Sequence, residues 1–554
     1  MLAGLEQKAI VIVGRSYSAL ERGMNLRIPE KLDTLGMQAI PMDMLPLEDQ
    51  SIAEDWPDMY WRSGQTMLRA ARFLAGHDKL YPIVIGTFSC GPDSFIMKYF
   101  KEELRGKPYL HIEIDEHSAD GGVITRCEAF LDSIGHRTGA SSAAHPRNRR
   151  TVQPSLKSRV VYIPPMTDHT HALAAAFERC GIHAEVLPES DRETMELGMK
   201  YVSGKECYPC ALTTGDMLKK AFSRGFDASR SAFFMPGGSG PCRFGQYNVF
   251  HRTVLESVGM ADVPILAPNQ DVGLYASLEM VSGDFALTAW KGIIAVDLLT
   301  KCLHEARPYE RQKGSSDEVY RHHLERLVRS LSGRNGRFED ALKAVQKDFA
   351  VLPKTGRRKP LIGIIGEIYV RNNRFSNEDL VRQVEALGGE ASLATFGEWI
   401  YYLNAMSIRR HLKGKEFFAA AKDALKNCLQ TRIEKHQSFP FRKHLRTLHE
   451  PSTQDILRLS GPYIPDTFEG EAVVSIGKSV ALVHQGVSGI INAIPFGCMP
   501  GIIVAGVMQA VKKKYDMPFI TMPYDGTASS ANKMLLEAFM DQAGVKARKS
   551  HSSW

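Results

Sequence analysis

Five cysteines lie in sequence contexts that rarely surround an ordinary core cysteine. The same order of an apolar strand-like run, a Gly/Pro loop and a helical pattern surrounds Cys90 in YPIVIGTFSCGPDSF, Cys242 in SAFFMPGGSGPCRFGQY and Cys498 in GIINAIPFGCMPGIIVAGV. Cys207 and Cys210 form a C-x-x-C pair in KECYPCALTTGD, where a helix is expected to begin. Thiolates bind zinc, iron and iron–sulfur clusters. Glycine lets backbone approach a bulky group, and N–H groups at a helix start favour an anionic one. The pattern predicts metal or cluster ligation.

Three other uses of these cysteines stay open. Any single loop cysteine is compatible with a buried, inert thiol. A dithiol redox motif would sit in the first strand–helix unit of a small domain and would need no other cysteine. A zinc site would normally bring a second close pair or a Cys/His pair, and none is present. The odd total of nine cysteines argues against a disulfide framework. A cluster shared by distant loops therefore fits best.

The other four cysteines lie in helical patterns. Cys127, in HSADGGVITRCEAFLDSI, suits a structural thiol, and it also suits a ligand in the first turn of a helix that follows the EIDEHSADGG loop. Cys180, Cys302 and Cys428 lie in ordinary amphipathic helices and are predicted to be structural.

The acidic loop before Cys127 is a candidate source of protons. Carboxylates and histidine deliver protons in catalysis, and the loop supplies Glu113, Asp115, Glu116, His117 and Asp120. Structural hydrogen bonds at a strand end are the competing interpretation. We assign no catalytic residue from the sequence.

The elements that would position these cysteines form three α/β segments. An apolar run that ends in a small-residue or proline turn opens each segment, near residues 8–18, 158–168 and 359–370, and a helical pattern and a further strand follow. Such units predict parallel sheets with right-handed crossovers. The expected fold is therefore α/β, with three Rossmann-like parallel-sheet segments and a metal cluster at the domain junction. Ligands bind beyond the carboxyl ends of strands in such sheets.

The predicted domains are 1–150, 151–350 and 351–554. Stretches rich in serine, proline and basic residues at 140–157 and 351–360 are expected to be linkers. Helical insertions are expected at about 275–350 and about 400–460. Ser376 and Asp379 are expected to form a capping-box-like helix start.

Composition indicates a globular protein of the cytoplasm. The 554 residues are 44% hydrophobic and 24% charged, and no run approaches the roughly 20 apolar residues of a membrane span. The N-terminus enters a strand-like segment without the layout of a signal peptide. The formal charge of +7 is a mild excess, and its basic runs fall in the linkers. Binding to nucleic acid or membrane is therefore not expected.

The combined motifs resemble a known family. GTFSCGPDSF, YLHIEIDEHSADGGVITRCEAFLDSI, GKECYPCALTTGD, GPCRFGQYN, GEIYVRNNRFSNEDLVRQVEALGGE, GEWIYY and IPFGCMPGI are similar to the 2-hydroxyacyl-CoA dehydratase superfamily, and more closely to its large activase-associated branch, related to the double-cubane cluster proteins. The resemblance covers nearly the whole chain.

This resemblance implies an oxygen-sensitive iron–sulfur redox enzyme. Low-potential electrons would come from an ATP-hydrolysing activator of the actin/Hsp70-like class with its own [4Fe-4S] cluster, and the enzyme would reduce a small molecule, as a homodimer. Six cysteines hold an [8Fe-9S] cluster in the double-cubane branch. The five loop cysteines and Cys127 make six here.

The sequence is also compatible with alternatives to a double-cubane enzyme. One is a 2-hydroxyacyl-CoA dehydratase-like component with a single [4Fe-4S] cluster, and another is a non-catalytic electron-transfer module. A structural zinc protein is the last. The glycine-rich PGGSGPC lacks the lysine of a phosphate-binding loop, so ATP hydrolysis is assigned to another chain.

Overall fold

A computed structural model describes residues 5–135, 156–269, 283–334, 336–527 and 530–551. The chain forms two compact units. Unit 1 comprises residues 1–153, 203–206 and 240–250, and unit 2 comprises residues 154–202, 207–239 and 251–554. Three four-stranded parallel sheets, all with the strand order 2-1-3-4, form the framework of the two units. This is the beginning of the flavodoxin-like doubly wound order.

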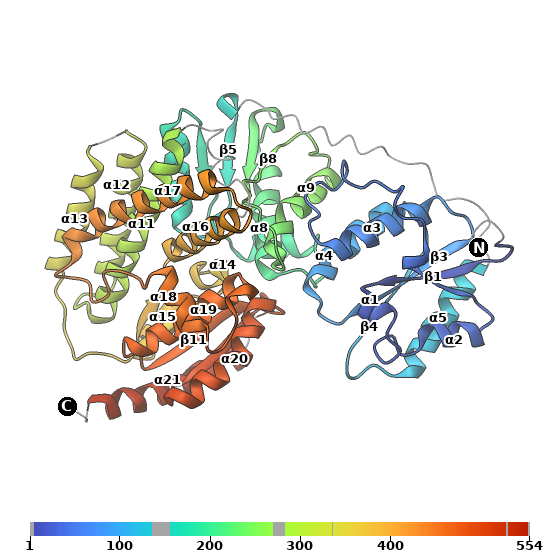
Figure 1. Ribbon diagram of the computed structural model, residues 1–554. Coiled ribbons are helices and arrows are strands. Elements are labelled where there is room, and N and C mark those ends of the chain that lie inside the picture. The colour runs from blue at the N-terminus through green and yellow to red at the C-terminus, as the bar shows by residue number, and fades with distance from the viewer. Residues whose placement is uncertain (1–4, 136–155, 270–282, 335, 528–529, 552–554) are drawn as a thin grey trace. The chain divides into compact units, whose positions relative to one another are not determined.

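Unit 1 holds the first sheet, drawn in blue in Figure 1. Its strands are β1 (Ala9–Gly14), β2 (Ala39–Pro41), β3 (Leu80–Thr87) and β4 (Leu110–Ile114). Its helices are α1 (Ser16–Ala19), α2 (Ile28–Thr34), η2 (Met42–Met44), α3 (Arg62–Ala75), α4 (Gly91–Glu103), α5 (Asp120–Gly135) and η5 (Arg243–Gln246). Every residue of β1 is buried, as expected of a parallel strand covered on both faces.

Unit 2 holds the second and third sheets. The second comprises β5 (Val160–Ile163), β6 (Ala184–Val186), β7 (Ser231–Phe234) and β8 (Ile265–Leu266). Around it in sequence lie η3 (Leu156–Ser158), α6 (His169–Arg179), α7 (Arg192–Met199), α8 (Tyr208–Ala221), η4 (Ala228–Arg230) and α9 (Tyr247–Ser257), whose first four residues group with unit 1. The third comprises β9 (Leu361–Gly366), β10 (Glu390–Leu393), β11 (Gly489–Pro495) and β12 (Phe519–Tyr524). Its helices are α14 (Ile368–Asn372), α15 (Leu380–Ala386), α19 (Glu471–His484), α20 (Met499–Tyr515) and α21 (Ser530–His551).

Two helical insertions complete unit 2. The first comprises α11 (Gly283–Ala306), η6 (Arg307–Tyr309), α12 (Ser315–Leu331) and α13 (Phe338–Val351). The second comprises α16 (Phe396–Lys413), α17 (Phe417–Ser438), η7 (Phe439–Phe441), α18 (Thr453–Ser460) and η8 (Asp466–Phe468). They share a hydrophobic core in which Trp290 and Leu299 of α11 pack with Phe441.

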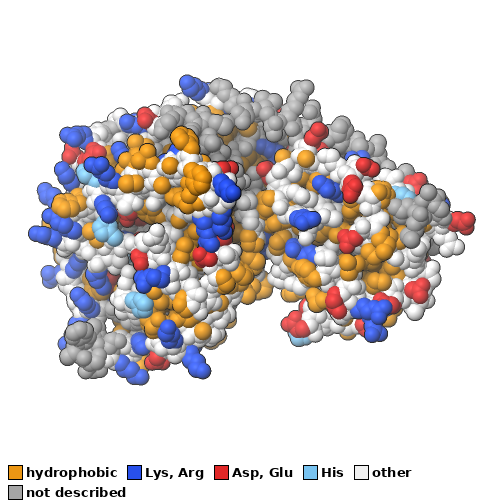
Figure 2. All heavy atoms as spheres, viewed as in Figure 1, with side chains coloured by type: hydrophobic (Ala, Val, Ile, Leu, Met, Phe, Trp, Pro, Cys, Tyr) orange, Lys and Arg blue, Asp and Glu red, His pale blue; other side chains and the backbone are white. Residues whose placement is uncertain are grey.

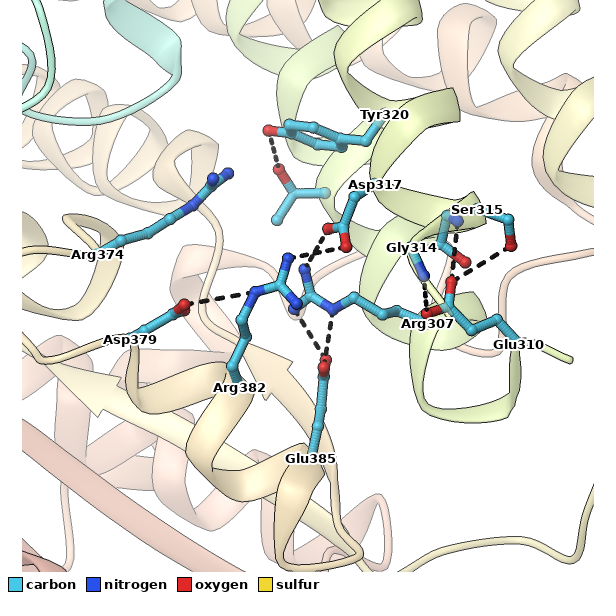
Figure 3. Close-up of polar contacts among 12 residues, drawn as sticks. Arg307, Glu310, Gly314, Ser315, Asp317, Tyr320, Arg374, Asp379, Arg382 and Glu385 are labelled. Carbon is cyan, nitrogen blue, oxygen red and sulfur yellow. Dashed lines mark hydrogen bonds and ion pairs between the residues drawn. The ribbon is translucent and has the colours of Figure 1, made fainter. Parts of the chain in front are cut away.

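Buried ion pairs attach the first insertion to the third sheet (Figure 3). Arg307 binds the carboxylate of Glu385 on α15 through two nitrogens, at 2.7 and 2.9 Å. It also donates to Asp317 of α12 at 3.0 Å, and Asp317 accepts from Arg382 of α15 at 2.8 Å. Bidentate, partly buried pairs of this kind fix orientation as well as adding energy, so the helices have a defined place on the sheet.

The sequence-based fold prediction is confirmed at the level of the α/β class, the three parallel-sheet segments and the helical insertions. The boundary at 150 agrees with the start of unit 2, whereas 350 falls inside unit 2 and residues 240–250 group with unit 1. The linker predicted at 140–157 lies almost entirely outside the described residues.

The predicted capping box is wrong. Helix α15 begins at Leu380, and its N-cap Asp379 has a left-handed conformation without a side-chain cap. Instead, the side-chain oxygen of Asn377 accepts from the Leu380 N–H at 3.1 Å. The hydroxyl of Ser376 donates to the carbonyl of Asn373 instead of capping the helix.

The surface is mixed in character. Apolar side chains gather over α17 on the face shown in Figure 2, and Phe418 of this helix is 87% exposed. Within the described ranges, no helix combines the length and the apolar character that crossing a membrane requires.

Candidate functional site

Four of the predicted cysteines occupy the same position relative to a helix. Cys90, Cys207, Cys242 and Cys498 are the N-cap residues of α4, α8, η5 and α20, with φ between −61° and −70° and an extended ψ. None of the four thiols makes a capping hydrogen bond to its described helix. The partial positive charge of a helix start favours a thiolate or another anion beside it.

A Cys-x-Pro sequence places three of these helix starts. Pro92, Pro209 and Pro500 each lie two residues after the N-cap cysteine. Proline has the backbone φ of a helix and lacks an N–H that the first turn would leave unpaired. The local sequence therefore begins the helix directly after each cysteine.

The turns that precede Cys90 and Cys498 are alike. The Cys90 N–H donates to the carbonyl of Thr87 at 3.0 Å, and the Cys498 N–H donates to that of Pro495 at 3.1 Å. The residue before each cysteine is left-handed: Ser89 has φ +58° and Gly497 has φ +66°. Because a serine rarely adopts this conformation, the turn of unit 1 is held by its surroundings.

A phenylalanine at the same place in each turn extends into solvent. Phe88 is 58% exposed and Phe496 is 61% exposed. Their N–H groups donate to the last residues of the neighbouring strands, Ile114 of β4 and Tyr524 of β12. Both turns thus follow the third strand of a 2-1-3-4 sheet at its carboxyl end, next to the point where the strand order reverses and where ligands bind in such folds.

Unit 1 brings the helix starts after Cys90 and Cys242 together. A Cβ atom on Gly91 would lie 3.1 Å from the side chain of Arg243, so the two helix starts pack closely against each other. The Tyr60 hydroxyl donates to the carbonyl of Cys242 at 3.3 Å. The two N-cap cysteines of unit 1 therefore belong to adjoining helix starts.

The surroundings of Cys90 keep its thiol protonated when no metal is bound. Burial and the carboxylate of Asp93 raise the pKa of Cys90 to about 11, against the effect of Arg15. Arg15 and Asp93 form an ion pair at 3.0 Å. Metal binding would displace the thiol proton, and Arg15 would then offset part of the thiolate's negative charge.

Unit 2 places the C-x-x-C pair and Cys498 at one edge of the third sheet. Cys207 and Cys210 lie in the first turn of α8, both buried, and the Cys210 N–H donates to the Cys207 carbonyl at 2.9 Å. Tyr208 packs in the same core as Tyr524, the residue whose carbonyl accepts from Phe496 in the Cys498 turn. A Cβ atom on Gly526, just after β12, would lie 2.8 Å from the Tyr208 ring, so the start of α8 lies beside the carboxyl end of the strand that neighbours the Cys498 turn.

Cys127 has the setting of a structural cysteine. The expectation that it lies in the first turn of a helix is wrong, because α5 begins at Asp120 and Cys127 is its eighth residue. Its side chain is fully buried in the core of the first sheet, beside Ile112 and Phe130. Its role as a sixth ligand stays a prediction.

Replacing Cys127 with Ala tests that role. The packing around Cys127 leads us to expect unchanged iron per chain and a lower melting temperature, since removing one buried heavy atom costs about 0.5–1.5 kcal/mol. Iron analysis and calorimetry of the same preparation measure both. A loss of iron in Cys127→Ala would instead establish the ligand role that the six-cysteine count predicts.

The cysteines predicted to be structural differ in burial. Cys302 lies in the core of the helical insertions, Cys180 is half-buried, and Cys428 is exposed on α17. All nine cysteines lie among the described residues, and none forms a disulfide there.

The acidic loop makes local structural contacts. Glu113 pairs with Lys205 at 2.6 Å and Asp120 with Lys31 at 3.1 Å. Asp115 accepts from a serine hydroxyl three residues later at 2.8 Å, and the other two side chains of the loop lie at the surface. These contacts favour the structural interpretation over proton delivery.

Sequence reasoning missed a group of buried and half-buried acids in unit 2. Asp216 of α8 accepts from the Ser190 hydroxyl at 3.0 Å, and burial raises the pKa of Asp216 to about 8. Glu367 and Glu471 are half-buried beside α14. The sequence carries a signal for this region, since residues 14–36 and residues 366–388 share Gly, Tyr, Asn and Gly at the same spacing.

The buried acid Asp216 predicts a pH dependence of stability. Its pKa lies above the ordinary carboxyl value, so the stability that protonation of Asp216 contributes is fully present below about pH 4 and is lost as the pH rises to about 8. The free energy of unfolding of the wild type should fall across this range by up to about 1.4 kcal/mol per pH unit for the one proton, and the melting temperature should fall with it. Asp216→Asn should lack that part of the fall, whereas the exposed control Asp262→Asn should keep it. Parallel wild-type and Asp216→Asn curves in calorimetry would refute the assignment.

The cysteine geometry stands alone as an indication of function. No family model matches the chain, and no curated protein matches it. Among the described residues, no three His, Cys, Asp or Glu side chains form a ready-made site for a metal ion. The iron–sulfur cluster and the family resemblance therefore stay predictions.

Proposed function

We propose that the protein is an iron–sulfur redox protein whose cluster ligands include Cys90, Cys207, Cys210, Cys242 and Cys498. One observation carries the proposal: four of these cysteines cap helices in one backbone conformation. Packing alone gives no reason to repeat this arrangement. Thiolate ligation by an anionic cluster gives one, because helix starts stabilise negative charge and supply N–H groups to sulfur.

The donor set fits a cluster better than a zinc ion. Cys207, Cys210 and Cys498 lie at one sheet edge within unit 2, and three thiolates hold one [4Fe-4S] cluster in the family that the sequence resembles. Unit 1 contributes Cys90 and Cys242 at adjoining helix starts. Such a cluster supplies one-electron transfer at a potential that nearby hydrogen bonds and burial tune.

The chain's own residues would control that potential and the access to the site. Arg15 offsets negative charge at Cys90. Phe88 and Phe496, on the turns before two of the proposed ligands, are exposed, so closure of these side chains over the cluster would be needed for them to limit the access of water.

The favoured type is a double-cubane [8Fe-9S] reductase that accepts electrons from an ATP-dependent activator and reduces a small molecule. If Cys127 is structural, as its packing indicates, the sixth ligand of such a cluster would be a residue other than cysteine. A single-cluster dehydratase-like component and an electron-transfer module remain the alternatives. The homodimer and the cytoplasmic location stay predictions from the resemblance and from the N-terminal sequence.

Iron and acid-labile sulfide analysis of anaerobically purified protein tests the proposal. About eight irons per chain with sulfide supports the double cubane, and about four supports the single cluster. Zinc without sulfide, or neither metal in protein that was never exposed to air, would refute the iron–sulfur proposal.

A further inference from the structure

Two half-buried glutamates lie together at the carboxyl edge of the third sheet. Glu367 follows β9 and accepts from the N–H groups of Tyr369 and Val370, at 3.0 and 2.8 Å. Glu471, the first residue of α19, accepts from the N–H of Ile368 at 2.9 Å. Both carboxylates therefore hold the same short segment at the start of α14.

The positive charge of Arg371 acts on both carboxylates of this pair. Arg371 is buried and acts electrostatically on both Glu367 and Glu471. It donates to the carbonyls of Gly366 at 2.9 Å and Thr395 at 3.4 Å, so its charge is shared with backbone groups. With one arginine beside two carboxyl groups, ionising the second carboxyl group costs more free energy than ionising the first.

An ion-pair network lies near Arg371. Arg371 also acts on Glu398 of α16, and Glu398 pairs with Lys478 of α19 at 2.8 Å. Lys478 pairs in turn with Glu450, which binds Lys301 of α11 at 2.6 Å. Ion pairs thus join Glu398, Lys478, Glu450 and Lys301 into one group, on which Arg371 acts only through its charge.

Two cavities border the same network. One, of about 50 Å³, is lined by Lys301, Glu450 and Lys478, and the other, of about 30 Å³, by Lys301, Glu398 and Glu450. A polar cavity holds water once it exceeds about 10–15 Å³ in this measure. Water in these cavities would link the buried network to bulk solvent.

We propose that the Glu367–Glu471 pair is a proton-binding site of unit 2, which holds one proton at neutral pH and exchanges it with solvent. The pair lies on the edge of the third sheet that also carries the Cys498 turn, since the Glu367 N–H donates to the carbonyl of Ala493 in β11 at 3.0 Å.

The local charges indicate which carboxyl holds the proton. Burial and the neighbouring Glu367 raise the pKa of Glu471 to about 8, with Arg371 and the Ile368 N–H opposing. Glu367 has two N–H donors and Arg371, although burial still raises its pKa. Farther along, burial would raise the pKa of Glu450, but Lys301 and Lys478 overcome this and lower it to about 2. Glu471 therefore carries the proton and Glu450 stays ionised.

The consequence for electron transfer rests on the proposed function. Negative charge added to a cluster at Cys498 would favour protonation of this pair, so one proton would be taken up with the electron. Because the pair already holds its proton below about pH 8, the titration point of Glu471, reduction would take up a proton, and would depend on pH, only above that value.

Infrared spectroscopy of the full chain between about pH 6 and pH 10 tests the proton site without reference to any cluster. The wild type should show a protonated-carboxyl band that titrates near pH 8 and shifts on transfer of the folded protein to D2O. Because Asp216 also titrates near pH 8, variants of the pair are compared in an Asp216→Asn background. There Glu471→Gln should lose the remaining band, while Glu367→Gln should lower its titration midpoint by about one pH unit or more, because the like charge is removed. Glu469→Gln, an exposed carboxylate two residues away, and Asp216→Asn alone should retain it.

A band that survives in Glu471→Gln in this background, or that fails to shift in D2O until the protein unfolds, would overturn the proton site. The coupling is tested separately on cluster-loaded protein. Its midpoint potential should be constant below about pH 8, where the pair already holds its proton, and should fall by about 59 mV per pH unit above that value, the one-electron equivalent of a tenfold change; Glu471→Gln should remove this slope. A flat potential in the loaded wild type would overturn the coupling, and failure to load any cluster would overturn the proposed function, while the infrared result decides the site in either case.

Discussion

Replacing Cys210 with Ala should remove most of the bound iron while leaving the fold intact. Cys210 lies in the first turn of α8 and is fully buried, and alanine is the residue most compatible with a helix. The loss of a ligand should weaken metal binding by more than the roughly 10–100-fold that a supporting residue contributes. Iron per chain, the visible absorption of the cluster and its electron paramagnetic resonance signal should fall together.

The matched control is Cys302→Ala. Cys302 is also buried in a helix, within the core of the helical insertions, so the same atom is removed from a comparable environment. Cys428→Ala adds an exposed control. If Cys210→Ala keeps its iron, or if Cys302→Ala loses iron to the same extent, the ligand assignment is wrong.

Reduction of the protein should require a second component. The cysteine set indicates a redox cluster, while the sequence holds no recognisable phosphate-binding loop. We expect reduction with an added activator and ATP, or with a strong reductant such as Ti(III) or Eu(II). The ratio of reduced to oxidised protein should then be at least about tenfold higher than with the activator alone, which corresponds to about 1.4 kcal/mol. Absorption bleaching under anaerobic conditions measures it.

Calorimetry with ATP and the isolated chain provides the control for this division of labour. Heat of tight ATP binding by the chain alone would contradict the assignment of ATP hydrolysis to another protein. Reduction by the activator without ATP would contradict it as well.

The sheets were predictable because their strands are near-continuous apolar runs between turn residues. AIVIVG of β1 and GIINAIP of β11 are buried throughout, as parallel strands covered on both faces must be. The cysteine loops were predictable for a related reason. A glycine or proline turn after such a strand places the next residue at the carboxyl edge of the sheet.

Other features depend on contacts between distant parts of the chain. The packing of Gly91 against Arg243 places residues 240–250 in unit 1, and no local pattern marks it. The position of Cys127 depended on where α5 begins, and helix ends are poorly marked when no capping side chain is present. The half-buried acids Glu367 and Glu471 are ordinary glutamates in sequence, and only the packing of α14 against α19 partly removes them from water.

The sequence contains a partial repeat. Gly14, Tyr17 and Asn25 match Gly366, Tyr369 and Asn377 at identical spacing. In the structure, a Cβ on Gly14 would clash with the carbonyl of Ile85, and one on Gly366 with that of Ala493. The shared spacing therefore reflects one local structure built twice, each copy followed by a turn that ends in Cys90 or Cys498.

Diffraction at the iron absorption edge from anaerobically grown crystals tests the central claim most directly. The account predicts anomalous iron peaks about 2.3 Å, the typical metal–thiolate distance, from the sulfur atoms of Cys207, Cys210 and Cys498, and further peaks beside those of Cys90 and Cys242. Iron-free density at all five cysteines, or a peak only at the zinc edge, would contradict it.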